Sequence, residues 1–289
     1  MVKKCLFPAA GYGTRFLPAT KAVPKEMLPI INKPLLQYGV EEALSAGISN
    51  MAIVTGRGKR AIEDHFDNSF ELESQLIGTS KESYLDEIKS LIEKSTFTYV
   101  RQHQKLGLGH AILTGEPLIG DESFAVLLAD DLCVNEDNNL LSKMIETYEK
   151  YQCSVIAVEE IPLTETEKYG IIAGELIDQS LNTFRVSDMI EKPNSNDLIN
   201  FAKDATKLKK SSTFMGVIGR YILTPDIFKI LKTIKPNKDG EIQITDALQI
   251  QAKLGKVVAY KFKGKRFDCG SIDGYLKAIN HFANKLKTN

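Results

Sequence analysis

Short apolar runs alternate with amphipathic stretches through the first half of the chain. The runs suited to buried strands cover residues 5–9, 51–54, 97–100 and 124–129. Apolar positions at helical spacing predict helices over residues 34–47, 60–66, 109–114 and 140–150. Strands and helices in alternation predict a mostly parallel sheet with helices on both faces.

In the second half of the chain, predicted strands and helices do not alternate regularly. Strand-like runs fall at 154–158, 184–190, 217–223 and 257–262, and helical patterns fall at 226–233, 242–254 and 275–286. The polar stretch 67–94 is too long for a simple connection and predicts a pair of helices that project from the sheet. No linker, repeat or low-complexity tract divides the chain. We therefore expect one Rossmann-like α/β domain over 1–289, with a mixed sheet and two functional halves, 1–135 and 136–289.

Composition and charge narrow the possible partners of the protein. The 37 Lys and Arg residues balance 37 Asp and Glu residues, which argues against a surface built to bind nucleic acid. A small phosphorylated ligand, which needs only a few local cations, remains compatible with this balance. None of the four cysteines forms a C-x-x-C pair, so reduced thiols in a cytoplasmic protein are expected. No apolar run approaches the ~20 residues of a membrane helix, and no membrane partner is expected.

The first predicted strand runs directly into a glycine loop. Positions 9–15 read AAGYGTR, in which the glycines allow close backbone approach, and the amide groups with Arg15 can hold a triphosphate. A dinucleotide-binding G-x-G-x-x-G motif is excluded because Phe16 stands at the third glycine position. A G-x-G pair alone is more often a tight strand-to-helix turn, so the loop needs support from its neighbours.

Two neighbouring features supply that support. Positions 18–29 read PATKAVPKEMLP, a proline-stiffened loop whose lysines suit phosphate binding, although isolated surface lysines are usually only solvated. Asp130 follows the strongest predicted strand, at the sheet edge where open α/β sheets keep their ligands. An isolated Asp after a strand is more often a turn cap, and that role suits Asp131 better.

Together these loops resemble those of the sugar-1-phosphate nucleotidyltransferases, and the likeness covers nearly the whole chain. Ala9-Ala10 and the KEMLP at 25–29 favour the uridylyl branch over the thymidylyl branch, which usually has Gly-Gly and KQLLP there. The resemblance implies a nucleotidyltransferase-type fold whose first half binds nucleotide and whose second half binds sugar phosphate. It implies an enzyme that joins UTP and glucose 1-phosphate into UDP-glucose and pyrophosphate with Mg²⁺. A homo-oligomer, either a dimer or a tetramer, is also expected.

The resemblance assigns the nucleotide mainly to the first half. The implied nucleotide-binding residues are Ala10, Gly11, Gly13, Glu26, Gln102, Gly107 and Asp130. Among them, the uracil contacts are Ala10, Gly11, Gln102 and Gly107, while Glu26 shapes the base site. Arg15 and Lys25 are implied to hold the triphosphate and to act as catalytic cations.

The second half is implied to hold the sugar phosphate. The implied sugar-binding residues are Gly170, Glu191, Lys192, Gly216 and Val217. Glu191 would accept hydrogen bonds from sugar hydroxyls, and Lys192, the third catalytic cation, would bind the attacking phosphate. Asp130 and Asp268 are the implied metal carboxylates. The segment 240–246 is family-typical but has no assigned role, and His110 fits either a packing role or a nucleotide contact.

Two other functions compete with this interpretation. A related enzyme that makes a dTDP-sugar or another NDP-sugar is disfavoured by Ala9-Ala10 and by the projecting segment. A non-catalytic sugar-nucleotide sensor would not need leaving-group cations such as Arg15 and Lys25.

Overall fold

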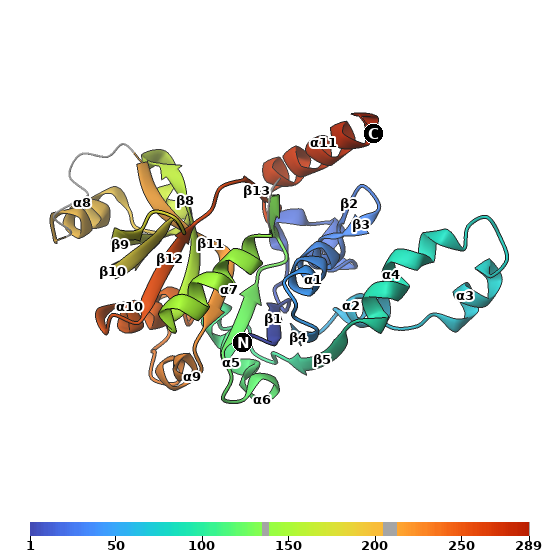
Figure 1. The fold of residues 1–289 in the computed structure, drawn as a ribbon, viewed down its shortest axis with the longest axis horizontal. Helices are drawn as coiled ribbons and strands as arrows, with labels where there is room; N and C mark the ends of the chain where they lie inside the picture. Colours follow the sequence, from blue (N-terminus) through green and yellow to red (C-terminus); the bar gives the residue numbers. More distant parts are fainter. Residues whose placement is uncertain (135–138, 205–212, 289) are drawn as a thin grey trace.

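Nine strands form one mixed sheet, in the order β5-β4-β1-β6-β11-β8-β12-β10-β9 (Figure 1). The computed structural model describes residues 1–134, 139–204 and 213–288. Helices flank the sheet, so the predicted α/β fold is confirmed. The expected boundary between the two halves, at 135/136, lies outside the described residues.

Parallel strands build the N-terminal half of the sheet. They are β1 (Lys4–Pro8), β4 (Asn50–Thr55), β5 (Thr96–Arg101) and β6 (Phe124–Leu127). Apart from the two helices of a projecting arm described below, the helices of this half are α1 (Leu35–Ser45), α2 (Arg60–His65), α5 (Gly107–Thr114) and α6 (Glu116–Ile119). The helix predicted at 34–47 ends at Ser45, two residues before Gly47, which has the left-handed φ of 83° that glycine tolerates. Because the strands are parallel, their carboxyl ends share one edge, where ligands bind in open α/β sheets.

Antiparallel strands dominate the C-terminal half. They are β8 (Ser154–Pro162), β9 (Gly170–Asp178), β10 (Thr183–Glu191), β11 (Thr213–Leu223) and β12 (Val257–Lys261). Strand β11 pairs antiparallel with both β6 and β8, and so joins the two halves into one sheet. The helices of this half are α7 (Leu140–Tyr151), α8 (Ser195–Asp204), α9 (Asp226–Leu231), α10 (Ile244–Lys253) and α11 (Ile272–Thr288). A 3-10 helix, η4 (Leu163–Lys168), precedes β9.

A two-stranded ribbon stands at the carboxyl end of β6. It pairs β7 (Asp131–Val134) with β13 (Lys265–Asp268), and its register sets Asp268 opposite Asp131. The strand predicted over 124–129 therefore ends early, at Leu127, because the chain turns out of the sheet to enter this ribbon. The smaller elements near it are β2 (Pro29–Ile30), β3 (Lys33–Pro34), η1 (Thr14–Phe16), η2 (Ala19–Lys21) and η3 (Lys25–Met27).

Two helices form an arm that projects from the sheet, as predicted for the polar stretch 67–94. They are α3 (Phe70–Leu76) and α4 (Ser83–Glu93), and Figure 1 shows them extending away from β5. The arm exposes large apolar side chains, including Phe70 and Tyr84. None of the helices in the described parts of the chain combines the length and apolar character needed to span a bilayer.

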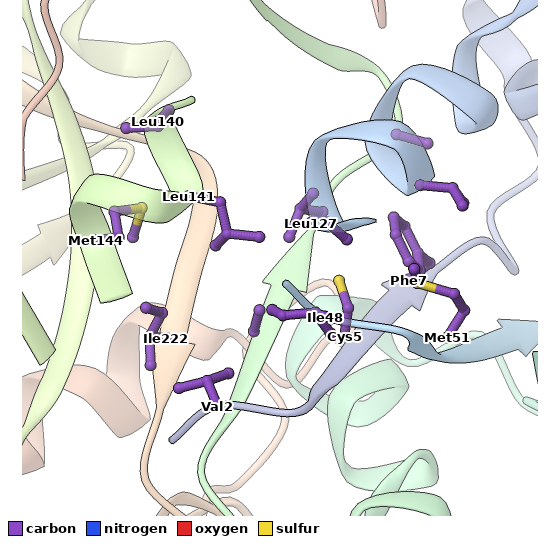
Figure 2. Packing of buried hydrophobic residues seen from close by; sticks show 14 of the residues in the cluster. Val2, Cys5, Phe7, Ile48, Met51, Leu127, Leu140, Leu141, Met144 and Ile222 are labelled. Atoms are coloured by element: carbon purple, nitrogen blue, oxygen red, sulfur yellow. The ribbon is translucent and has the colours of Figure 1, made fainter. Parts of the chain in front are cut away.

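The sheet buries apolar side chains on both faces. In β1, Cys5 and Phe7 point to one cluster, while Leu6 between them points to the other, as the two-residue period of a strand requires. Leu127 of β6 joins the first cluster, together with Leu141 of α7, as Figure 2 shows. Burial on both faces explains why these strands read as continuous apolar runs rather than alternating ones.

We predict that Leu127→Ala destabilises the protein by about 2–5 kcal/mol, because it removes a fully buried side chain and leaves a cavity. Leu254→Ala is the matched control, since Leu254 is 64% exposed, and should change stability by less than about 0.5 kcal/mol. Urea unfolding of both variants checks this. Equal effects of the two changes would show that the cluster around β6 does not support the fold.

Candidate active site

Two neighbouring cavities lie along the ligand edge of the sheet. The larger has a volume of about 660 Å³ and is lined from both halves of the chain. Its lining includes these sequence-predicted residues: Arg15, Gly107, Asp130, Gly170, Glu191, Lys192, Val217 and Asp268. The smaller has a volume of about 480 Å³ and is lined by Gln102 together with Tyr12, Arg57, Arg101, His103 and Lys105. The Gln102 Nε2 donates to the Gly107 carbonyl (3.4 Å), which places the two cavities side by side.

An ion pair joins the glycine-loop side of the larger cavity to the end of β6. The Lys25 Nζ lies 2.6 Å from Asp130 Oδ2, and each side chain is 24% exposed. Burial acts to raise the pKa of Asp130, but the Lys25 ammonium and the Arg15 guanidinium outweigh it and hold that pKa below its ordinary value. Burial likewise acts to lower the pKa of Lys25, and Asp130 reverses that shift. Both groups therefore carry their charges at neutral pH.

A second carboxylate faces Asp130 across Gly270. A Cβ added to Gly270 would lie 2.8 Å from Asp130 Oδ2 and 3.0 Å from Asp268 Oδ1. The Asp268 Oδ1 accepts the Gly270 N–H (3.0 Å), and Arg15 Nη1 donates to the Gly270 carbonyl (3.0 Å). The β7–β13 ribbon thus brings together residues that are far apart in sequence: Arg15, Asp130 and Asp268.

This pair of carboxylates fits a divalent cation that is completed by its substrate. Within residues 1–134, 139–204 and 213–288, no three His, Cys, Asp or Glu side chains gather as a metal cluster. Mg²⁺ commonly binds proteins through one or two carboxylates, with substrate phosphates and waters as its other ligands. Asp130 and Asp268, facing each other at the cavity wall, meet that description.

Asp131 was predicted to cap a turn or a helix, and that prediction is wrong. Its side chain is buried, its Oδ2 accepts the Gly219 N–H (2.7 Å), and its Oδ1 accepts from Arg266 Nε (2.7 Å). Arg266 Nη1 also donates to Glu159 Oε1 (2.6 Å) and to the Tyr169 hydroxyl (3.0 Å). Burial acts to raise the pKa of Asp131 while the Arg266 guanidinium acts to lower it, and the raised value shows that burial is the larger effect. The network ties the loop after β6 to β8 and to the start of β9.

A second buried arginine holds the same loop from the other side. Arg220 of β11 donates to Glu42 Oε2 on α1 through Nη2 (2.8 Å). Its Nη1 donates to the Leu128 and Gly219 carbonyls (3.1 and 3.0 Å). The structural roles of Arg220 and Arg266 were not predicted from the sequence. A charged residue inside the apolar run 217–223 was the available signal for Arg220, since a buried charge requires a partner.

The glycine loop packs tightly on the proline-stiffened loop. Gly13 has a left-handed φ of 66°, and a Cβ there would lie 3.0 Å from Lys25 Cβ. The Thr20 hydroxyl donates to the Gly13 carbonyl (2.7 Å), which fixes the distance between the two loops. Ala10 is buried and Gly11 is exposed on the same loop, and neither lines either of the two cavities described above.

Two predicted nucleotide-binding residues, Glu26 and Gln102, are oriented by neighbouring side chains. Glu26 is 1% exposed and its Oε2 pairs with Lys59 Nζ (2.6 Å), while its Oε1 is buried without a protein partner. Burial raises the pKa of Glu26 and lowers that of Lys59. Gln102 Nε2 lies 2.8 Å from His110 Nδ1. Burial, aided by His103, lowers the pKa of His110, so its neutral ring accepts the Gln102 amide proton. His110 therefore orients Gln102, and it lines neither cavity.

The predicted sugar-binding residues Gly170, Glu191 and Lys192 lie together where β9 and β10 pair. Glu191 lies in register with Gly170, and a Cβ on Gly170 would lie 3.2 Å from Glu191 Oε2. Glu191 Oε1 pairs with Lys192 Nζ (3.2 Å). Lys192 has a φ of 43°, a left-handed conformation that is uncommon outside glycine and recurs at ligand sites. Val217 lines the cavity, whereas Gly216 does not, and a Cβ on Gly216 would meet the Ile161 side chain at 2.9 Å.

Known proteins resemble the chain over its full length. The sequence model of the nucleotidyl transferase family matches residues 6–285. A Pseudomonas aeruginosa protein named UTP–glucose-1-phosphate uridylyltransferase is 59% identical over 290 residues, which cover 100% of this chain and 99% of that protein. A solved structure of apo UDP-glucose pyrophosphorylase is 58% identical, with a TM-score of 0.89 and 99% of each chain covered. Another, of UDP-glucose pyrophosphorylase complexed with UDP-glucose, is 55% identical with a TM-score of 0.87, covering 99% of this chain and 100% of that one.

We predict that Arg266→Met destabilises the protein by about 3–5 kcal/mol, because it leaves buried Asp131 without its cation. Lys143→Met is the control, since Lys143 pairs with Glu146 at the surface and its loss should leave the urea midpoint unchanged. An Arg266→Met protein as stable as the parent would mean that this network does not hold the loop after β6.

Proposed function

The chain belongs to the nucleotidyl transferase family, and we propose that it transfers a uridylyl group from UTP to glucose 1-phosphate, giving UDP-glucose and pyrophosphate. The observation that carries the proposal is the charge distribution of the larger cavity. Arg15 and Asp130, which pairs with Lys25, lie at one part of its wall, and Glu191 and Lys192 lie at another. Such a cavity offers cations to two phosphorylated ligands and a carboxylate to a sugar.

The nucleotide would lie along the first half of the site. The base would rest against Gln102 and Gly107, with Ala10 and Gly11 supplying backbone contacts. The buried Oε1 of Glu26, which has no protein partner, also favours a hydrogen-bond donor in this region. The triphosphate would then reach Gly13, Arg15 and Lys25. The two cations among them, Arg15 and Lys25, would stabilise the charge that develops on the leaving pyrophosphate.

The sugar phosphate would occupy the β9–β10 side of the cavity. Glu191 would accept hydrogen bonds from sugar hydroxyls beside Gly170, where the absence of a side chain leaves room. The side chain of Lys192 is 53% exposed, so its ammonium is free to leave Glu191 and to contact the phosphate. Val217 would pack against the ring. Gly216 has no side chain, so any contact that it makes with the sugar would come from its backbone.

The chemistry needs positioning more than proton transfer. An oxygen of the sugar phosphate attacks the α-phosphorus in line, a new P–O bond forms, and the bond to pyrophosphate breaks. The nucleophile is already an anion at neutral pH, so no general base is required. Mg²⁺ held by Asp130 and Asp268 would reduce the repulsion between the two anionic substrates. Lys25 would exchange its contact with Asp130 for one with the triphosphate.

Self-association and a cytoplasmic location complete the proposal. Phe70, Ile77 and Tyr84 are exposed on the projecting arm, which supports a homo-oligomer, a dimer or a tetramer. All four cysteines are free, which supports a reducing compartment. Light scattering on the parent and on a Phe70→Ser, Tyr84→Ser variant tests the oligomer. A monomeric parent would contradict the proposed homo-oligomer. A variant with the same oligomeric state as the parent would show that the arm does not form the interface.

We predict that UTP with glucose 1-phosphate is the best substrate pair in a pyrophosphate-release assay with a panel of nucleotides and sugar phosphates. Replacing UTP by dTTP should weaken transition-state binding by roughly 1–3 kcal/mol, because a site that hydrogen-bonds the ribose 2′-hydroxyl leaves that partner unpaired with deoxyribose. Equal or faster turnover with dTTP would instead place the chain in the thymidylyl branch. Binding without any turnover would favour a sensor.

We predict that Asp130→Asn and Asp268→Asn each remain folded and each lose most activity. If both carboxylates serve one ion, the double variant should be little worse than either single one, because residues that act as a unit are not additive. Steady-state rates against divalent-ion concentration, with circular dichroism for folding, provide the measurement. Near-normal activity and metal dependence of Asp268→Asn would leave Asp130 as the only carboxylate ligand.

A further inference from the structure

The segment 240–246, which the sequence analysis left without a role, forms a wall of the larger cavity. Glu241, Gln243, Ile244 and Thr245 all line this cavity. The segment leads into α10, which begins at Ile244. We call it the bridging segment, because one of its ends contacts the loop that carries Gly107 and its other end contacts Glu191.

At the base end, the bridging segment is held by backbone hydrogen bonds. The Ile242 N–H donates to the Leu106 carbonyl (2.8 Å), and the Gly109 N–H donates to the Ile242 carbonyl (2.9 Å). A Cβ on Gly107 would lie 2.9 Å from Glu241 Cβ, and a Cβ on Gly109 would lie 2.7 Å from the Ile242 oxygen. Side chains at these glycines would therefore push the segment away from the base loop.

At the sugar end, the bridging segment reaches the carboxylate of Glu191. The Thr245 hydroxyl donates to Glu191 Oε2 at 2.5 Å, and Thr245 is 5% exposed. The other carboxylate oxygen, Oε1, pairs with Lys192. One turn further along α10, Gln249 Nε2 donates to the Met189 carbonyl of β10 (2.8 Å), which fixes the helix against the strand. The carboxylate of Glu191 is thereby held from both sides.

We propose that Thr245 is a positioning residue for Glu191, and that the bridging segment couples the base loop to the sugar site. This inference rests on the proposed function, in which Glu191 accepts hydrogen bonds from the sugar. The hydrogen bond from Thr245 to one oxygen fixes the rotation of the Glu191 carboxylate, and so fixes the direction in which its remaining lone pairs face the sugar. Without that hydroxyl, the carboxylate can rotate toward Lys192, and its selectivity for the arrangement of sugar hydroxyls falls.

The test compares Thr245→Val, which keeps the side-chain shape, with Thr245→Ser, which keeps the hydroxyl. Thr147→Val is the matched control, because Thr147 is buried in α7 with its hydroxyl bonded to the Lys143 carbonyl, and it does not line the cavity. Kinetics with glucose 1-phosphate and with deoxy analogues that each lack one hydroxyl are measured alongside UTP binding by calorimetry.

We expect Thr245→Val to raise the KM for glucose 1-phosphate roughly 5- to 20-fold, because a misoriented Glu191 loses part of its hydrogen bonding to the sugar. Discrimination against the deoxy analogue whose hydroxyl contacts Glu191 should shrink by a similar factor, and UTP affinity should stay unchanged. Thr245→Ser should restore both. Unchanged discrimination in Thr245→Val, or parallel losses of UTP affinity, sugar affinity and thermal midpoint, would overturn the positioning role. A parent protein inactive with UTP and glucose 1-phosphate would instead overturn the proposed function itself.

Gly109→Ala tests the coupling separately. Its added Cβ would displace the Ile242 carbonyl, so the KM values for both UTP and glucose 1-phosphate should rise, although Gly109 does not line the sugar side. A rise confined to UTP would show that the bridging segment does not transmit the displacement to Glu191. The parent protein and Thr147→Val serve as references in the same assays.

Discussion

The buried ion pair between Asp131 and Arg266 determines where the loop after β6 lies. Two adjacent aspartates leave the sheet there, and Asp131 enters the protein interior, where a carboxylate without a partner would be strongly unfavourable. Arg266 supplies the partner and extends the contact to Glu159 and Tyr169. Arg220 fixes the Leu128 carbonyl from the opposite side. The position of Asp130 at the cavity is therefore a consequence of structural ion pairs around it.

The adjacent aspartates have opposite roles because their surroundings differ. Asp131 is bonded to a backbone N–H and to a guanidinium that nothing in the mechanism displaces. Asp130 is partly exposed and paired with Lys25, and in the proposed function the incoming phosphates would draw Lys25 away. The same contrast recurs on the sugar side, where Thr245 holds one oxygen of Glu191 and the exposed Lys192 holds the other. Fixed partners orient Asp131 and Glu191, and in the proposed function the cations Lys25 and Lys192 would be available to the substrates.

Local patterns in the sequence were sufficient to predict β1, β4 and β6, because these strands are buried on both faces, and helical spacing of apolar positions predicted α1, α2 and α5. Position and residue type also predicted Asp130, which lines the larger cavity, and the two loops beside it, whose phosphate-binding role stays a prediction. Strand β9 was missed, because its exposed and buried positions give no continuous apolar run. The β7–β13 pairing, the partners of Arg266 and the contact of Thr245 with Glu191 join residues far apart in the chain. No local spacing encodes such contacts, and the wrong role for Asp131 has the same cause.

The most direct test of this account is a crystal structure of the protein with UDP-glucose and Mn²⁺, with data collected at the manganese absorption edge. We predict an anomalous peak from the manganese ion between Asp130 and Asp268, at roughly 2.0–2.3 Å from a carboxylate oxygen of each. We also predict the uracil against Gln102 and Gly107 and the hexose against Glu191. A peak remote from both aspartates, or a nucleotide bound with its base at Glu191, would contradict this account.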